Sequence, residues 1–315
     1  MDPPRAITGG MGRWSRSMKH SKRLPRGAGR FKTSDGLSLW FRIAGGGPAL
    51  LVPTPGWGAS VDMYMKSLVP LERDFSVVYL DTRGAGRSDP PVSDPPMKSS
   101  GYHFKNFLDD IEKLRRHLEL DRWLIFGHSD ASLQAMGYAL EHPRTCHGLF
   151  IVDGTVNLPD DPQIKSDLRA HRKKFLHKPW FVAADEAGVG RTNNEFRRNF
   201  LDFQLPMYFA SRVAAGKARH YFSASTYRVK HNEYDTYTPN FPSWKLERIR
   251  VPTAVFVGDS DLITTPLESL MIARAIPNAT LGIIRNAGHF PWLQRRDAFF
   301  RDFTQAAQII LEGKH

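Results

Sequence analysis

Three residues whose side chains could work together are spaced widely along this chain: Ser129, Asp261 and His289. A serine hydroxyl is a poor nucleophile near neutral pH until a base takes its proton. An imidazole, with an ordinary pKa of about 6.5, can be that base, and a carboxylate can fix its tautomer and stabilise its positive charge. The three residue types together therefore predict nucleophilic attack on a carbonyl carbon through an acyl-enzyme.

Ser129 lies between a predicted strand and a predicted helix. Residues Trp123–Phe126 form an apolar run, Gly127 allows a tight turn, and Asp130–Tyr138 begins a helix. A serine on such a turn presents its hydroxyl beside the first helical N–H groups, which can stabilise an oxyanion. The usual pattern is Gly-x-Ser-x-Gly, and Ala131 stands in place of the last glycine. We expect its methyl group to shift the turn slightly without abolishing it.

The chain order of serine, aspartate and histidine, each just past a predicted strand, is similar to that of α/β-hydrolases. The most specific resemblance lies in Asp81–Ser88, which is similar to the Asp-x-Arg-Gly-x-Gly-Arg-Ser segment of proline iminopeptidases. From about Gly29 onward the chain resembles the group of this superfamily that contains proline iminopeptidases and esterases. The resemblance implies an α/β fold with a mostly parallel eight-stranded sheet, helices on both faces, and a helical cap inserted between strands 6 and 7.

The resemblance also implies where an oxyanion hole would lie. One donor would come from the loop after the third strand, where Trp57 follows Gly56, and the other from the residue after the nucleophile, Asp130. The backbone N–H groups of Trp57 and Asp130 are therefore the expected donors. Pro55 replaces the family histidine, and the loop departs from the His-Gly-Gly-Pro-Gly form of proline iminopeptidases. This departure favours an ester or lactone substrate over a prolyl amide.

The identity of the acid and the role of Asp130 each leave alternatives. The family spacing Gly-x-x-Asp, counted from Gly258, selects Asp261, with Asp259 as the alternative. Asp153 is a further candidate because a few relatives place the acid after that strand, although we expect it to satisfy loop backbone. The Asp130 carboxylate would be stabilised by the dipole of the helix it begins. Alternatively, it points into the pocket and attracts a cationic group of the substrate.

The elements that must position these residues alternate between strands and helices, which predicts a mostly parallel sheet. The predicted strands are Arg30–Thr33, Leu37–Arg42, Ala49–Pro53, Ser76–Leu80, Trp123–Phe126, Gly148–Val152, Ala254–Gly258 and Leu281–Arg285. Helices are expected at Phe104–Leu120 and Asp297–Leu311. We expect Asp81, Arg83 and Arg87 to pair with each other or with nearby backbone rather than to bind substrate.

The alternation of strands and helices stops between residues 157 and 250, which are polar, helical in pattern, interrupted by prolines and rich in aromatic residues. We expect a tail at 1–29, an α/β core at 30–156 and 251–315, and a helical cap at 157–250. A cap would exclude water and shape an apolar pocket. Glu233 and Asp235 could anchor a substrate amine, as cap acids do in proline iminopeptidases, although a solvated face explains them more simply.

The net charge of +12 belongs mainly to one end of the chain. Residues 1–32 carry nine basic residues and one acidic residue, Asp2, whereas the rest is almost balanced. A nucleic-acid partner is therefore not implied, and the tail is expected to be disordered. No apolar run is long enough for a membrane span. We expect a cytoplasmic protein, with import into an organelle through the Arg- and Ser-rich tail as the alternative.

The single cysteine, Cys146, rules out an internal disulfide, and the histidines lack metal-ligand spacing, so we predict no metal and no cofactor. The predicted function is a serine hydrolase that cleaves an ester, lactone or amide bond of a small, largely apolar or aromatic substrate. Alternatives are a prolyl-type aminopeptidase and an enzyme that cleaves a carbon–carbon bond. An alternative of another class is a small-molecule receptor on a hydrolase scaffold with little turnover. The sequence leaves the oligomeric state open.

Overall fold

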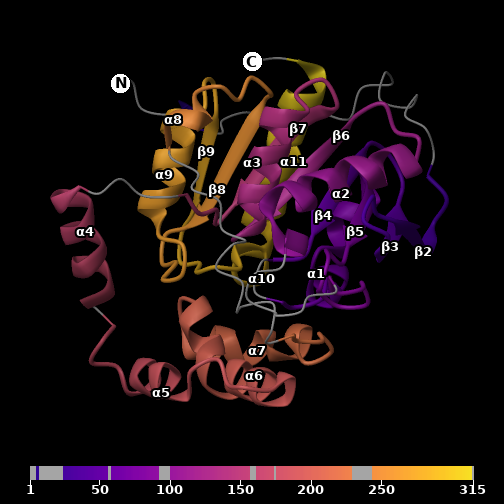
Figure 1. Cartoon of the computed structure of the whole chain (residues 1–315). Coiled ribbons are helices and arrows are strands. Elements are labelled where there is room, and N and C mark those ends of the chain that lie inside the picture. Colours follow the sequence, from indigo (N-terminus) through magenta and orange to yellow (C-terminus); the bar gives the residue numbers. More distant parts are fainter. Residues whose placement is uncertain are drawn as a thin grey trace.

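A twisted sheet of nine described strands forms the centre of the computed structural model (Figure 1). The structure describes residues 5–6, 24–55, 58–91, 100–156, 161–173, 175–228 and 243–313. The strands are β1 (Arg5–Ala6), β2 (Gly27–Lys32), β3 (Ser38–Gly45), β4 (Ala49–Pro53), β5 (Ser76–Leu80), β6 (Trp123–His128), β7 (Cys146–Val152), β8 (Thr253–Gly258) and β9 (Thr280–Ile284). Their spatial order is β1-β9-β8-β7-β6-β4-β5-β3-β2.

All eight predicted strands are present, with ends within three residues of those expected. The antiparallel pairs are β2 with β3 and β3 with β5, and the other pairs are parallel. Strands β4, β5, β6 and β8 are buried along their whole length, because helices cover both faces of the sheet. The sequence therefore predicted these strands from continuous apolar runs.

The ninth strand, β1, corrects the expectation that the whole basic tail is disordered. Arg5 and Ala6 pair in parallel with Thr280 and Leu281 of β9. Without β1, β9 would be the edge of the sheet, where unpaired backbone groups are available to a further strand. The rest of the predicted tail up to residue 23 lies outside the described residues.

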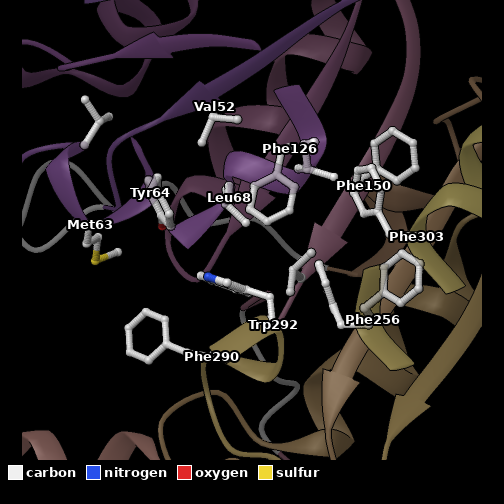
Figure 2. Packing of buried hydrophobic residues seen from close by; sticks show 14 of the residues in the cluster. Val52, Met63, Tyr64, Leu68, Phe126, Phe150, Phe256, Phe290, Trp292 and Phe303 are labelled. Atoms are coloured by element: carbon white, nitrogen blue, oxygen red, sulfur yellow. The ribbon is translucent and has the colours of Figure 1, made fainter. Parts of the chain in front are cut away.

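Alternate residues of each strand point to opposite faces of the sheet, and each face has its own apolar core. In β6, Leu124 and Phe126 join one core, whereas Trp123 and Ile125 join the other. The first core lies under helices α1 (Asp62–Ser67), α10 (Pro291–Gln294) and α11 (Arg296–Glu312). Figure 2 shows part of it, with Phe126, Phe150 and Phe256 close to Trp292 and Phe303.

The second core lies under α2 (Phe104–His117), α3 (Ala131–Glu141), α8 (Ser243–Leu246) and α9 (Pro266–Ala275). The predicted helix Phe104–Leu120 ends three residues early, because Glu119 takes a positive φ of 51°. The last helix, α11, ends at Gly313, whose φ of 66° gives the left-handed cap that glycine favours. Short 3₁₀ helices lie at Val69–Arg73 and Ser100–Tyr102.

Between β7 and β8 the chain leaves the sheet and forms helices that we call the inserted segment, defined as the described residues from 161 to 228. It contains α4 (Pro162–Lys173), α5 (Pro179–Ala187), α6 (Asn193–Asn199), a π-helical turn (Phe200–Gln204), a 3₁₀ turn (Leu205–Tyr208) and α7 (Arg212–Phe222). Figure 1 shows α5, α6 and α7 as a layer below the core, with α4 beside it. Among the helices of the described residues, none is long and apolar enough to cross a membrane.

Candidate active site

Ser129 occupies a sharp turn between β6 and α3. Its φ is 56°, in the left-handed region that non-glycine residues seldom adopt, and the residue is 6% exposed. The Ser129 N–H donates to the carbonyl oxygen of Val152 at 3.1 Å, which holds the turn against β7. A Cβ on Gly127 would lie 2.8 Å from the Cα of Ser132, so a glycine is required where strand and helix meet. Ala131 fits at the start of α3 and is fully buried.

His289 and Asp261 form a buried hydrogen-bonded pair. The His289 Nδ1 atom lies 2.8 Å from Asp261 Oδ2, and both side chains are 0% exposed. The Ile263 N–H donates to Asp261 Oδ1 at 2.8 Å, and the Thr264 hydroxyl lies 3.0 Å from Asp261 Oδ2. Asp259, the alternative acid, is exposed and bonds to Ser260 instead. The aspartate that orients the imidazole in this structure is therefore Asp261.

The second ring nitrogen of His289, Nε2, is not held by a hydrogen bond within the described residues. The atom is buried. Because Nδ1 is held by a carboxylate, Nδ1 carries the hydrogen and the neutral ring keeps a lone pair on Nε2. Such an atom can accept a proton, which makes it the candidate base of the site.

Asp153 lies close to the His289–Asp261 pair and is completely buried. Its Oδ1 atom accepts from the Gly258 N–H at 2.9 Å, which matches the backbone role expected for it. Its Oδ2 atom has no partner among the described residues. Burial, and then the nearby charge of Asp261, raise the pKa of Asp153 well above its ordinary value, so the protonated form is favoured.

Asp153, Asp261 and His289 are also the described residues whose ligand atoms are close enough to hold a metal ion, all within 4.8 Å of one another. Two of these groups already share the His289–Asp261 hydrogen bond. The third is a carboxyl that favours its proton, and a metal needs the ionised form. A metal ion at this position would have to compete with the His289–Asp261 hydrogen bond.

The sequence analysis missed His128, the residue directly before Ser129. Its Nδ1 atom lies 2.7 Å from the Tyr64 hydroxyl, and its Nε2 atom lies 2.8 Å from the main-chain oxygen of His289. The His128 and His289 rings are 4.6 Å apart between centroids. Burial, and then His289, lower the pKa of His128 well below its usual value, so its ring is neutral. Its position next to Ser129 was a signal that could have been used.

The inserted segment contacts the loops that carry the candidate residues. His171 Nε2 of α4 lies 3.0 Å from the main-chain oxygen of Asp261, and the His289 N–H donates to the Tyr208 oxygen at 2.9 Å. At a third point, Ser60 and Thr226 exchange hydrogen bonds of 3.0 and 3.1 Å beside the β-bridge between Ala59 and Tyr227. These contacts join segments that are far apart in the sequence, so no local pattern predicted them.

Of the predicted oxyanion donors, only Asp130 belongs to the described residues. It is the N-cap residue of α3, with φ −61° and ψ −28°, so its backbone lies at the start of the helix as expected. Trp57 and its neighbour Gly56 lie outside the described residues. The same holds for Glu233 and Asp235, the alternative anchors for a substrate amine.

The segment that resembles proline iminopeptidases builds scaffold, as predicted. Arg87 pairs with Asp81 at 3.1 Å and with Asp62 at 2.5 Å. Arg83 is buried and makes two hydrogen bonds of 2.7 Å to Asp110, a partner that the sequence analysis did not name. These ion pairs fix the loop after β5 and leave Arg83 and Arg87 satisfied by protein partners.

Comparison with known proteins identifies the family. The sequence profile of the alpha/beta hydrolase fold matches residues 49–295. The chain belongs to the alpha/beta hydrolase fold family. It is 26% identical over 281 residues to the proline iminopeptidase PfmaB of Pestalotiopsis fici, which covers 85% of this chain and 95% of that protein. It is 28% identical over 276 residues to a Caulobacter protein described as a carbamate hydrolase, covering 82% and 90% of the two chains.

Among solved structures, an alpha/beta fold family hydrolase from Bacillus anthracis superposes on this hydrolase with a TM-score of 0.71. The match covers 90% of this chain and 99% of the other at 20% sequence identity. This likeness establishes the fold, and the family with its hydrolase relatives establishes that the chain is an enzyme. The family match also confirms the fold and the superfamily that the sequence predicted.

Proposed function

We propose that this protein is a serine hydrolase in which Ser129 is the nucleophile, His289 the general base and Asp261 the residue that orients it. The observation that carries the proposal is the buried His289–Asp261 pair. In this pair the Nε2 atom of His289 has no partner among the described residues. His128 links the His289 main chain to the turn on which Ser129 lies. A base that is oriented by a carboxylate and a serine on a strained strand-to-helix turn are the two parts that acyl transfer requires.

The proposed reaction begins when His289 Nε2 takes the proton of the Ser129 hydroxyl. Oγ then attacks the substrate carbonyl carbon, and the carbonyl oxygen becomes an oxyanion. The Asp130 N–H at the start of α3 and the Trp57 N–H, the latter inferred from the family resemblance, would stabilise this charge. His289 returns its proton to the leaving group, and the acyl group remains on Ser129. Water activated by His289 then releases the acid and restores the serine.

We further propose that the inserted segment, within residues 157–250, acts as a cap over this site. Its contacts to Asp261 and His289 support this role. The half-buried ring of Tyr208 lies 5.4 Å from the His289 ring, and Phe209 packs against Phe290. An aromatic wall next to the base favours an apolar or aromatic group on the substrate.

The bond that is cleaved is proposed to be an ester or lactone, with a prolyl amide as the second candidate. The relative PfmaB is named as a proline iminopeptidase, and this name favours a prolyl amide. Pro55 stands where the loop of proline iminopeptidases has histidine, and this departure favours an ester or lactone. All of these substrates share a carbonyl carbon that Ser129 would attack.

The deciding experiment is labelling with a fluorophosphonate probe, read by intact mass, on wild type, Ser129→Ala and Ser260→Ala. One adduct is expected on the wild type and on Ser260→Ala, whose serine is half-exposed and outside the site. No adduct is expected on Ser129→Ala. An adduct that persists in Ser129→Ala, or a folded wild type that is never labelled, would refute the proposal. Panels of aryl esters, lactones and prolyl amides would then distinguish the substrates.

A further inference from the structure

The side chain of His128 connects two segments that a serine hydrolase must hold in register. Its own main chain continues directly into Ser129 at the end of β6. Its Nε2 atom lies 2.8 Å from the main-chain oxygen of His289, which comes 161 residues later in the sequence. The candidate nucleophile and the candidate base are therefore joined by one side chain and one hydrogen bond.

The geometry fixes the tautomer of His128. A carbonyl oxygen can only accept, so Nε2 must carry the hydrogen that it donates to His289. Nδ1 is then a lone-pair acceptor and receives the hydrogen of the Tyr64 hydroxyl, 2.7 Å away. Tyr64 is fully buried, so its hydroxyl gains little from water and is well placed for this bond. Both ring nitrogens of His128 are satisfied only when the imidazole is neutral.

The residues around His128 favour the neutral imidazole and fix the position of its ring. Its ring lies 4.8 Å from the Trp292 ring and 5.1 Å from the Phe290 ring, measured between centroids. Figure 2 shows Tyr64 and Trp292 next to each other in the core, with Phe290 at its edge. Among the described residues, the titratable groups that face His128 are Tyr64 and His289. No carboxylate bonds to it among the described residues, so nothing there compensates a positive charge.

We propose that His128 is a positioning residue, which sets the place of His289 relative to Ser129 by donating its Nε2 hydrogen to the His289 main chain. The inference rests on the proposed function, because it assigns a role within that site. The His289 N–H is held separately by the Tyr208 oxygen. Both main-chain polar groups of His289 are thus anchored, one from the core and one from the inserted segment. A small displacement of the base relative to the nucleophile slows reaction strongly.

Two variants separate the donor from the rest of the side chain. His128→Gln can place an amide N–H where Nε2 lies and so keep the bond to His289. His128→Asn reaches only as far as Nδ1, so it can still accept from Tyr64 but cannot reach the His289 oxygen. The second-order rate constant for fluorophosphonate labelling should fall by about tenfold or more in His128→Asn. It should stay within about threefold of wild type in His128→Gln.

The rate of labelling reports activation of Ser129 and does not depend on knowing the substrate. Once an ester substrate is found, the loss in His128→Asn should fall on kcat with KM nearly unchanged. His142→Gln is the matched control, since this half-buried histidine at the end of α3 packs against Tyr138, away from the site. It should label at the wild-type rate.

Wild-type labelling rates in a folded His128→Asn would overturn the inference and leave the proposed function intact. Equal slowing of His128→Asn and His128→Gln, with unchanged melting temperatures, would also overturn it, because the donor would then not matter. If His128→Asn does not fold, His128→Met decides: it has the length of glutamine but no donor for the His289 oxygen. It should label about tenfold or more slower than His128→Gln, and equal rates would refute the role. A folded wild type that is never labelled would overturn the proposed function and this inference together.

Discussion

The main-chain N–H of His289 donates to the main-chain oxygen of Tyr208 at 2.9 Å. A residue of the inserted segment thus holds the candidate base directly. The neighbouring Gly288 allows this approach, because a Cβ there would lie 2.7 Å from the Tyr208 oxygen. With the bond from His171 to Asp261, the inserted segment contacts both members of the His289–Asp261 pair. We therefore expect it to influence the rate of reaction as well as access to the site.

The contact between His171 and Asp261 offers a direct test of this influence. His171→Ala removes the donor to the Asp261 main chain and should slow fluorophosphonate labelling by about three- to tenfold, because the acid loses one anchor. His177→Ala, an exposed histidine that follows α4, is the control and should behave as wild type. Equal labelling rates for both variants would show that α4 does not position the acid.

The choice between the two neighbouring aspartates can be tested with a matched pair of substitutions. Asp261→Asn removes the charge that holds the hydrogen on His289 Nδ1, so turnover should fall by about three to four orders of magnitude. Asp259→Asn changes an exposed residue that bonds to Ser260, and its turnover should stay close to wild type. Steady-state hydrolysis of an ester substrate measures both. A larger loss in Asp259→Asn would reverse the assignment.

The turn before Ser129 should tolerate no added side chain at Gly127. The new Cβ of Gly127→Ala would meet Ala135 Cβ and Ser132 Cα at 2.8 Å, so unfolding free energy should drop by about 1–3 kcal/mol. Gly216→Ala is the control: nothing lies within 4 Å of its Cβ in α7. It should add about 0.5–1 kcal/mol, because alanine favours a helix. Urea unfolding compares them, and equal stabilities would contradict the packing argument.

The buried carboxyl of Asp153 predicts a pH dependence of stability. Burial first, and Asp261 second, raise its pKa well above the ordinary value of 3.8. The folded state therefore binds more protons, so the contribution of Asp153 to stability is fully present below about pH 3.8 and declines as pH rises toward the folded-state pKa. Asp153→Asn cannot ionise and keeps an oxygen for the Gly258 N–H. Its unfolding free energy relative to wild type should therefore increase with pH.

Urea unfolding at several pH values from about 4.5 to 8 measures this trend. Gly216→Ala serves again as the control, because it changes no titratable group and should give a nearly constant difference. A difference between Asp153→Asn and wild type that does not change with pH would show that Asp153 is ionised in the folded protein.

Many strands and helices of the α/β core were predictable from local sequence patterns. The predicted strands Ala49–Pro53 and Ser76–Leu80 match β4 and β5 residue for residue, since a strand that is covered on both faces is almost entirely apolar. Helix α2 followed from apolar residues at helical spacing. The inserted segment was expected to be helical, but its π-helical turn at Phe200–Gln204 has no sequence signature that we recognised.

The sequence by itself determined which residue types are present, their order, and the turn that places Ser129 at the end of a buried strand. These features depend on neighbours within a few positions, where backbone preference and hydrophobic pattern act directly. The spacing from Gly258 already favoured Asp261 over Asp259, and the tertiary structure shows that Asp261 bonds to His289. Tertiary structure alone decided that the two-residue strand β1 pairs with β9. It also decided that His128 reaches the His289 main chain. Each of these contacts joins segments that are far apart in the chain, and only the packed fold fixes such distances.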